Sequence, residues 1–268
     1  MRAVRVSALG GPESLEVVEI DEPAADGGIV VDVHAAGVAF PDALLTRGLY
    51  QYRPELPFTL GAELAGVVRA APAGAKVKAG DRVLGLTMIG GAMAETAVLN
   101  PDNVFPLPDN VSFEAGAGLL FNDLTVYFAL TVRGRLAKGE TVLVHGAAGG
   151  IGTSTLRIAP ALGASRVIAV VSSEDKADVA RAAGATDVVL ADGFKDSVAE
   201  LTGGKGVDIV MDPVGGDRFT DSLRSLAPAG RLLVVGFTGG EIPTVKVNRL
   251  LLNNIDVVGV GWGAWTMT

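Results

Sequence analysis

The first part of the chain, residues 1 to about 110, is dominated by short runs of alternating apolar and polar positions that Gly, Pro and Asp interrupt. Such runs predict short strands at close spacing. Residues 40–48 instead predict a helix that starts at a proline-aspartate pair and stops at Gly48. The predicted strands are RAVRVSA, LEVVEI, GIVVDVHAAGV, AGVVRAA, DRVLGLTM, AETAVL and NVFPLP. This pattern predicts a small, irregular β-domain.

Residues 112–136 change to a helical pattern. Three residues at i, i+3 and i+4 spacing share the face that is predicted to pack, namely Leu124, Tyr127 and Phe128. Asn122 or Asp123 is the predicted N-cap of this helix. We expect the helical stretch to connect two domains, residues 1–122 and 123–268.

Beyond Lys138, apolar runs of strand length alternate with helical patterns. Strands are predicted at 141–145, 166–171, 187–190, 207–212, 231–237 and 255–262. Helices are predicted near 150–162, 173–183, 194–202, 216–226 and 246–253. Regular alternation of this kind predicts an α/β fold with a doubly wound parallel sheet.

The stretch VLVHGAAGGIG, residues 142–152, predicts a strand, a tight turn and the start of a helix. A turn of this kind directs unpaired backbone N–H groups and the positive end of the helix dipole at one point, which suits a pyrophosphate. With Ala147 in the first position the motif is AxGxxG, and the apolar run 166–171 follows at the spacing of a βαβ unit. The predicted dinucleotide-binding residues are Gly146, Ala147, Gly149, Gly150, Ile151 and Gly152.

The end of the second strand of this unit distinguishes the two nicotinamide cofactors. An NAD-specific domain usually has Asp or Glu there, which accepts from the ribose 2′-hydroxyl and repels a 2′-phosphate. Here the strand is followed by Ser172 and Ser173, and Lys176 lies one turn into the next helix. These three residues predict NADPH. The alternative is that Lys176 is a solvated surface residue and that the neighbouring acids only favour the helix dipole.

Composition narrows the function classes. The net charge is −8, and no Lys/Arg cluster exceeds a couple of residues, so the sequence predicts no nucleic-acid partner. The chain has no cysteine, which excludes disulfides and thiolate metal sites. No stretch approaches the ~20 apolar residues that cross a bilayer, and the first ten residues contain no apolar signal segment. We therefore expect a cytoplasmic protein without a membrane partner.

Several segments together resemble the zinc-free quinone oxidoreductase branch of the medium-chain dehydrogenase/reductase superfamily, and they occur in family order. They are GVAFPDALLTRGLYQ, LGAELAGVV, GDRV, LPDNVSFEAGAGLL, VLVHGAAGGIG, MDPVGG and RLLVVGF. The resemblance implies a GroES-like β-rich catalytic domain followed by a Rossmann cofactor domain. It also implies NADPH as the cofactor, with Lys176 at the 2′-phosphate.

Three departures from the family pattern matter. Zinc-dependent relatives carry metal ligands where this chain has Ala39, Ala62 and Phe121, and Glu63 by itself cannot hold zinc, so no metal is expected. Quinone reductases of this branch usually have asparagine at the position of Ala39. Relatives also continue past GVGWGAW with a helix and strands that return to the first domain, so part of the expected fold is absent here.

The resemblance implies hydride transfer to a quinone or another conjugated carbonyl such as an enone, a reaction in which the cofactor supplies the hydride. The residues predicted to contact the substrate or the nicotinamide are Tyr50, Tyr52, Asn122 and Thr125. Backbone contacts to the carboxamide are expected from Gly236, Phe237 and Thr238, which lie just past the fifth strand. His34 and His145 are expected to be structural.

Two other functions remain open. One is an enoyl-thioester reductase, and the other is a non-catalytic protein that binds NADPH or a partner. A homodimer is expected through the strand 255–262, because its sequence carries one charge, Asp256, and has no lysine or proline to protect an exposed edge.

Overall fold

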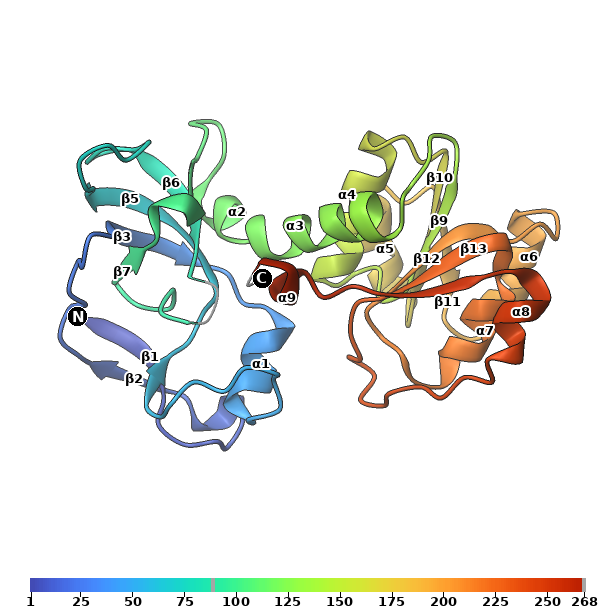
Figure 1. Cartoon of the computed structure of the whole chain (residues 1–268), viewed down its shortest axis with the longest axis horizontal. Helices are drawn as coiled ribbons and strands as arrows, with labels where there is room; N and C mark the ends of the chain where they lie inside the picture. Colours follow the sequence, from blue (N-terminus) through green and yellow to red (C-terminus); the bar gives the residue numbers. More distant parts are fainter. Residues whose placement is uncertain (88–89, 267–268) are drawn as a thin grey trace. The chain divides into compact units, whose positions relative to one another are not determined.

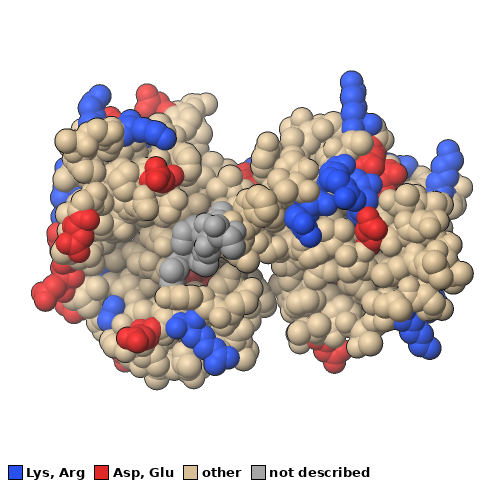
Figure 2. Space-filling model, viewed as in Figure 1, with Lys and Arg blue, Asp and Glu red and all other residues tan. Residues whose placement is uncertain are grey.

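The structure is a computed structural model that describes residues 1–87 and 90–266. The chain divides into two compact units, Met1–Phe121 and Asn122–Thr268, and each is described by itself (Figure 1). Within the described residues, no helix is both long enough and apolar enough to cross a membrane. On the face that Figure 2 shows, Lys and Arg lie among Asp and Glu and form no continuous basic surface.

The first unit is built on two antiparallel sheets. In the described residues, one sheet has the strand order β7-β3-β5-β6-β8 and the other has the order β2-β1-β4. The strands are β1 (Arg2–Val6), β2 (Glu16–Glu19), β3 (Ile29–Ala36), β4 (Phe58–Thr59), β5 (Glu63–Ala70), β6 (Arg82–Leu86), β7 (Thr96–Leu99) and β8 (Val104–Pro106). Alternation along β3 places Ile29 and Val31 in the core, where Val31 is the register partner of Val68.

The strands predicted for this unit are present, mostly with shorter bounds than the sequence pattern suggested, whereas β5 begins two residues earlier than the predicted run AGVVRAA. The pattern did not predict β4, because two residues are too few to show alternation. The predicted strand DRVLGLTM extended to residue 88, which lies outside the described residues.

The described residues of the first unit include two short α-helices that lie wholly within it. Helix α1 (Phe40–Thr46) begins where expected, and the Asp42 carboxylate caps it by accepting from the N–H of Ala39 at 2.8 Å. Helix α2 (Phe113–Ala117) is capped by the Ser112 hydroxyl, which accepts from the N–H of Ala115. Two short 3₁₀ helices, Pro12–Ser14 and Pro101–Asn103, complete the unit.

The predicted connecting helix is three segments rather than one. After α2 come α3 (Leu120–Phe128) and a π-helix (Ala129–Arg133). The predicted cap at Asn122 or Asp123 is wrong, because α3 already begins at Leu120 and both residues lie inside it. The prediction that Tyr127 packs is also wrong. Its neighbour Phe128 is buried, whereas Tyr127 is 53% exposed, since the apolar stripe is too narrow to cover both rings.

The second unit holds the predicted parallel sheet. In the described residues its strand order is β11-β10-β9-β12-β13-β14, and all of its pairs are parallel. The strands are β9 (Thr141–Val144), β10 (Arg166–Val171), β11 (Asp187–Leu190), β12 (Val207–Asp212), β13 (Leu226–Val234) and β14 (Asp256–Gly259). The main helices are α4 (Gly150–Ala161), α5 (Glu174–Ala182), α6 (Phe194–Leu201), α7 (Phe219–Arg224) and α8 (Asn248–Asn253). A one-turn 3₁₀ helix, Gly216–Arg218, precedes α7.

Helices cover both faces of this sheet (Figure 1). Along β9, Val142 and Val144 pack into one core with residues of α4 and α5. Leu143 points the other way into a second core with Phe194 of α6. This period of two confirms the doubly wound arrangement that the alternation of elements predicted.

The last predicted strand is shorter than expected. Strand β14 ends at Gly259, and a short helix, α9 (Trp262–Thr266), occupies the region where the strand was expected to finish. The aromatic ring of Trp265 lies 5.6 Å from that of Phe128 in α3. This ring contact between distant segments is not visible in the local pattern.

Candidate functional site

The strand order of the second unit reverses at β9. From β9 the chain continues to β10 and β11 on one side, and it then returns to β12 on the other side of β9. In such sheets, ligands bind at the carboxyl ends of the strands on either side of this reversal. The glycine-rich turn follows β9 directly, so the structure places it at this point.

Backbone geometry makes the glycines of the turn necessary. Gly146 has φ +58, a conformation that other residues rarely adopt. At Gly152 an added Cβ would lie 2.4 Å from the carbonyl oxygen of Gly146 and 2.5 Å from the Cα of Ala147. The first helical bond of α4 runs from Thr153 N–H to Gly149. The N–H groups of residues 150–152 therefore have no partner within the helix and are available to an anion.

Asn122 reaches this turn from α3. A Cβ added at Gly150 would lie 2.6 Å from Nδ2 of Asn122, so the amide rests directly on the start of α4. The next residue, Asp123, accepts from the Ser154 hydroxyl and from Arg157 at 2.8 Å, which joins α3 to α4. Thr125 is buried one turn further along α3. The structure thus brings Asn122 into contact with the turn.

The second predicted segment lies at the end of β10. Lys176 Nζ donates to the Ser172 hydroxyl at 2.9 Å, and both side chains are exposed. Ser173 occupies the N-cap position of α5, but its side chain makes no cap. Its hydroxyl hydrogen-bonds to the Asp175 carboxylate, and this bond is the main reason that the pKa of Asp175 is lowered. Lys176 therefore supplies a positive charge at this strand end, and the Ser172 hydroxyl accepts from it.

The third predicted segment follows β13. Thr238 N–H donates to the carbonyl of Pro213 at 3.0 Å. A Cβ added at Gly215 would lie 2.8 Å from the ring of Phe237, and one at Gly236 would lie 3.4 Å from the Pro213 carbonyl oxygen. The segment 236–238 is thus fixed against the loop that follows β12. All three predicted cofactor segments lie at the carboxyl edge of one parallel sheet.

A buried His, Asp and Ser cluster lies beneath this edge. His145 Nε2 lies 2.8 Å from the Ser222 hydroxyl, and both residues are 0% exposed. Asp212, which is also buried, accepts from the N–H groups of Val214 and Gly215 at 2.9 Å each. The arrangement is not a hydrolase triad, because no substrate reaches Ser222 and the Asp212 carboxylate holds backbone groups instead of the imidazole.

In the first unit, the two predicted tyrosines differ. Tyr50 is half-buried against a small core that contains Leu45 and Leu60. Burial, followed by the negative charge of Asp42, raises the pKa of the Tyr50 hydroxyl. Tyr52 is 45% exposed. Only Tyr50 is thus held by packing.

The burial of Asp42 is a feature that the sequence did not predict. Its carboxyl is 3% exposed, and burial raises its pKa against the opposing effect of the backbone N–H of Ala39. Its Oδ1 has no hydrogen-bond partner within the described part of the chain. A helix-capping aspartate follows from the sequence, but its interaction with the backbone N–H of Gly61, which also opposes the rise in its pKa, depends on the fold.

Ala39, Ala62 and Phe121 stand where the sequence resemblance places the metal ligands of zinc-dependent relatives. In the described residues, no group of three or more His, Asp or Glu side chains could hold a metal ion. Ala39 and Ala62 carry no donor atoms, and Glu63 Oε2 accepts from the backbone N–H of Phe121 at 2.8 Å. Glu63 therefore ties β5 to the start of α3.

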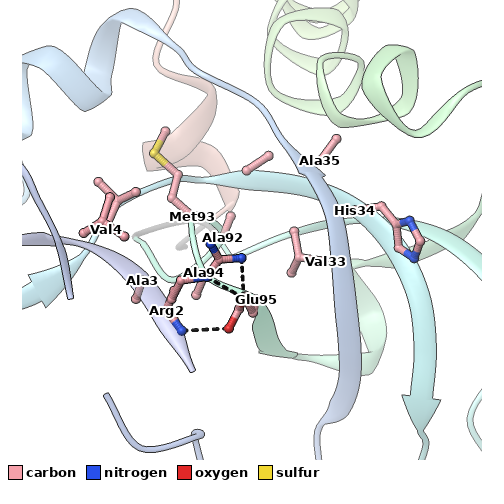
Figure 3. Close-up of a pocket in the computed structure, with 12 residues that line it drawn as sticks. Arg2, Ala3, Val4, Val33, His34, Ala35, Ala92, Met93, Ala94 and Glu95 are labelled. Carbon is pink, nitrogen blue, oxygen red and sulfur yellow. Dashed lines mark hydrogen bonds and ion pairs between the residues drawn. The ribbon is translucent and has the colours of Figure 1, made fainter. Parts of the chain in front are cut away.

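A shallow hollow of about 350 Å³ opens in the first unit between β1, β3 and the segment 92–95 (Figure 3). Small apolar side chains such as Ala3 and Ala35 dominate its lining, and the ion pair between Arg2 and Glu95 lies at its edge. Tyr50 and Tyr52 are not among the described residues that line it.

A glycine turn at the reversal point of a doubly wound sheet, preceded by a β-rich unit, defines a dinucleotide-dependent oxidoreductase class. Comparison with known proteins agrees. A family described as the alcohol dehydrogenase GroES-like domain matches residues 25–109, and one described as zinc-binding dehydrogenase matches residues 150–268. The chain belongs to the zinc-free quinone oxidoreductase branch of the medium-chain dehydrogenase/reductase superfamily.

Individual relatives show the extent of the match. Quinone oxidoreductase-like protein 2 of Rattus norvegicus is 43% identical over 88% of this chain and 68% of the relative. Quinone oxidoreductase of Homo sapiens is 34% identical over 97% of this chain and 80% of the relative. A solved probable oxidoreductase from Mycobacterium abscessus has a TM-score of 0.89 at 45% identity, covering 100% of this chain and 82% of that one. Escherichia coli quinone oxidoreductase complexed with NADPH has a TM-score of 0.89 at 34% identity, and the match covers 100% of this chain and 83% of that one.

Proposed function

We propose that this protein is an NADPH-dependent reductase that transfers a hydride to a quinone or another conjugated carbonyl. The observation that carries the cofactor choice is the Lys176 and Ser172 pair at the end of β10, where an NAD-specific domain would have a carboxylate. Solved relatives from a mycobacterium, Escherichia coli and Thermus thermophilus are described as complexes with NADPH. Relatives named quinone oxidoreductase support the substrate class.

The residues present fit this cofactor. The turn at Gly146 has no room for a side chain at Gly152, and it exposes backbone N–H groups that suit a pyrophosphate. The Lys176 ammonium and the Ser172 hydroxyl would hold the 2′-phosphate, and the backbone of 236–238 would hold the carboxamide. When bound, the cofactor supplies the hydride.

The residues of this chain would then bind and orient the nicotinamide and the substrate. Asn122 rests on the start of α4, so its amide is fixed by packing at the cofactor turn. Burial, followed by the charge of Asp42, raises the pKa of the Tyr50 hydroxyl, which favours its protonated form, and this hydroxyl would donate to the oxygen on which charge develops. Tyr52 and Thr125 complete the set of residues that we propose to contact substrate or nicotinamide.

We also propose that two copies pair through β14. This strand lies at the end of the sheet and pairs with β13 on one side only in the described residues. Its residue Val257 is 36% exposed. A strand edge without a paired neighbour favours strand pairing. The side chains of Arg133 and Arg135 bond to Gly259 and Asp256 of this strand. Sedimentation at micromolar concentration should show a dimer, and a monomer would contradict this assembly.

The function is tested by mixing the protein with NADPH and either benzoquinone or naphthoquinone, and following oxidation of the cofactor. We expect turnover with the quinones and weaker activity with NADH. Faster turnover of an enoyl thioester than of any quinone would favour the thioester reductase. Binding of NADPH without turnover of any acceptor would identify a non-catalytic binding protein and overturn the proposal.

A further inference from the structure

The position of the buried His145 follows from strand alternation. Leu143 of β9 and Val210 of β12 point to the face of the sheet that α6 and α7 cover. His145 and Asp212 lie two residues further along these neighbouring strands, so their side chains enter the same space. The imidazole packs edge-on against Phe194 at 4.9 Å between ring centroids. The cluster is therefore part of the floor beneath the cofactor edge.

The hydrogen bonds determine which nitrogen of His145 carries the proton. The Ser222 hydroxyl lies 3.0 Å from the carbonyl of Arg218 and 2.8 Å from His145 Nε2. A hydroxyl has one proton, so with Ser222 donating to this carbonyl we assign the ring proton to Nε2, which donates to Ser222. Nδ1 then holds a lone pair and has no hydrogen-bond partner within the described residues. Burial, with a smaller contribution from the charge of Arg218, lowers the pKa of His145 to about 4 against the opposing charge of Asp212. The ring is neutral at neutral pH.

Because Nδ1 carries no proton, Asp212 remains an acceptor for the backbone. Its Oδ1 holds the N–H groups of both Val214 and Gly215. A ring that carried Nδ1–H would attract this carboxylate, because the two side chains lie on the same face of neighbouring strands, and would draw it away from the backbone groups. The tautomer that Ser222 selects therefore decides how tightly the loop 213–215 is held.

The loop 213–215 contacts two of the three cofactor segments. A Cβ at Gly146 would lie 3.2 Å from Val214 Cγ2, so the glycine turn rests on this loop. On the other side, Gly239 N–H donates to the Val214 carbonyl at 2.9 Å, just beyond the segment 236–238. A change in this loop would displace both segments together.

We propose that His145 is a positioning residue for the cofactor. The hydrogen bond to Ser222 keeps the lone pair of His145 on Nδ1. The Asp212 carboxylate is therefore free to hold the loop 213–215 beneath both cofactor segments. The inference rests on one part of the proposed function, namely that the protein binds NADPH. Ser222 itself lies on the far side of the ring and contacts no predicted cofactor residue.

The test compares Ser222→Ala with a matched control, Ser225→Ala. Ser225 is also buried, and its hydroxyl also bonds to a backbone carbonyl of α7, but it does not contact His145. In the cofactor-free protein, we expect the amides of Val214 and Gly215 to exchange with solvent about tenfold faster in Ser222→Ala, and NADPH to bind about tenfold more weakly. The control should change neither quantity. A loss of stability alone would move both variants alike.

The outcomes separate the inference from the function. If either amide exchange or NADPH affinity in Ser222→Ala matches the control, the proposal is overturned. If the unsubstituted protein binds no NADPH, the proposed function fails, and amide exchange decides the inference by itself. Should Ser222→Ala not fold, imidazole nitrogen NMR of the unsubstituted protein decides, since the chain has only two histidines. A proton on Nδ1 of His145 would overturn the proposal, and one on Nε2 supports it.

Discussion

The two regions assigned to cofactor and to substrate are built in different ways. In the second unit, the glycine turn that we propose for the cofactor presents backbone groups, and its shape excludes even one added carbon at Gly152. In the first unit, the region around Tyr50 depends on side chains, with Asp42 buried and Tyr50 packed on a small core. A backbone site is specified by glycine spacing, whereas a side-chain site is specified by packing that has no periodic pattern. Substitutions should therefore affect the two regions to different degrees.

The largest effect is expected from Gly152→Ala. The added methyl would overlap backbone atoms of residues 146 and 147, which cannot rotate away. We expect NADPH affinity to fall by roughly a hundredfold, because such overpacking costs up to about 3 kcal/mol. Gly118→Ala is the control, since its Cβ would meet its nearest neighbour only at 4.0 Å. Isothermal titration measures both, and equal affinities would show that backbone shape does not decide the cofactor site.

The next effect is expected from Lys176→Ala. Loss of a charge-assisted contact to the 2′-phosphate should weaken NADPH binding by about 1.5–3 kcal/mol, or roughly ten- to a hundredfold. NADH, which lacks that phosphate, should bind almost as before. Lys195→Ala, at an exposed ion pair with Asp196, is the control. Equal losses of affinity for NADPH and NADH would show that Lys176 does not act through the 2′-phosphate.

The two histidines offer a direct comparison of the units. His145 is fully buried with a pKa near 4, below the usual 6.5, whereas His34 is exposed and stacks on Phe113. A depressed folded-state pKa contributes stability that is complete above pH 6.5 and is lost as the pH falls toward 4. Between pH 7.5 and 5.5 the loss from His145 is about 1.4 kcal/mol.

Urea unfolding at these two pH values measures this difference. His145→Gln should lose about 1.4 kcal/mol of the pH dependence, and His34→Gln should keep it. If both variants retain the same pH dependence, the imidazole of His145 is not the group that titrates.

The smallest effect is expected from Tyr50→Phe. Removing one hydrogen bond to the developing oxyanion should lower kcat by up to about tenfold, or about 0.5–1.5 kcal/mol, with little change in NADPH affinity. Tyr127→Phe is the control, because Tyr127 is exposed on α3. Steady-state kinetics with a quinone gives both values. An unchanged kcat would place the substrate contacts elsewhere.

The glycine turn and the parallel strands were the most predictable parts of the chain. A continuous apolar run such as residues 166–171 has few alternatives to a buried strand, and the structure has β10 over those residues. Predictions failed where the local signal was weak. Asn122 resembled a helix cap, yet packing sets the start of α3 at Leu120. Residues 260–262 continued a strand-like run, yet the strand ends at Gly259.

Some decisive contacts join residues that no local pattern relates. His145 and Ser222 are 77 positions apart, and they meet only because α7 packs on one face of the sheet. Arg231 donates to the carbonyl of Gly134 and to Glu140, 97 and 91 positions away, and so secures the segment after the π-helix to β13. Neither pair shows a spacing that a helix or strand period would reveal.

The sequence by itself determined the order of elements, the doubly wound sheet and the place of the cofactor turn, because backbone periodicity and glycine conformation act over a few residues. The tertiary structure alone decided that Asp42 is buried and that His145 is neutral, because burial depends on which distant segments cover a side chain. It also decided that Asn122 rests on Gly150. The position of the proposed cofactor turn therefore follows from short-range sequence pattern, whereas the contacts that hold it in place follow from long-range packing.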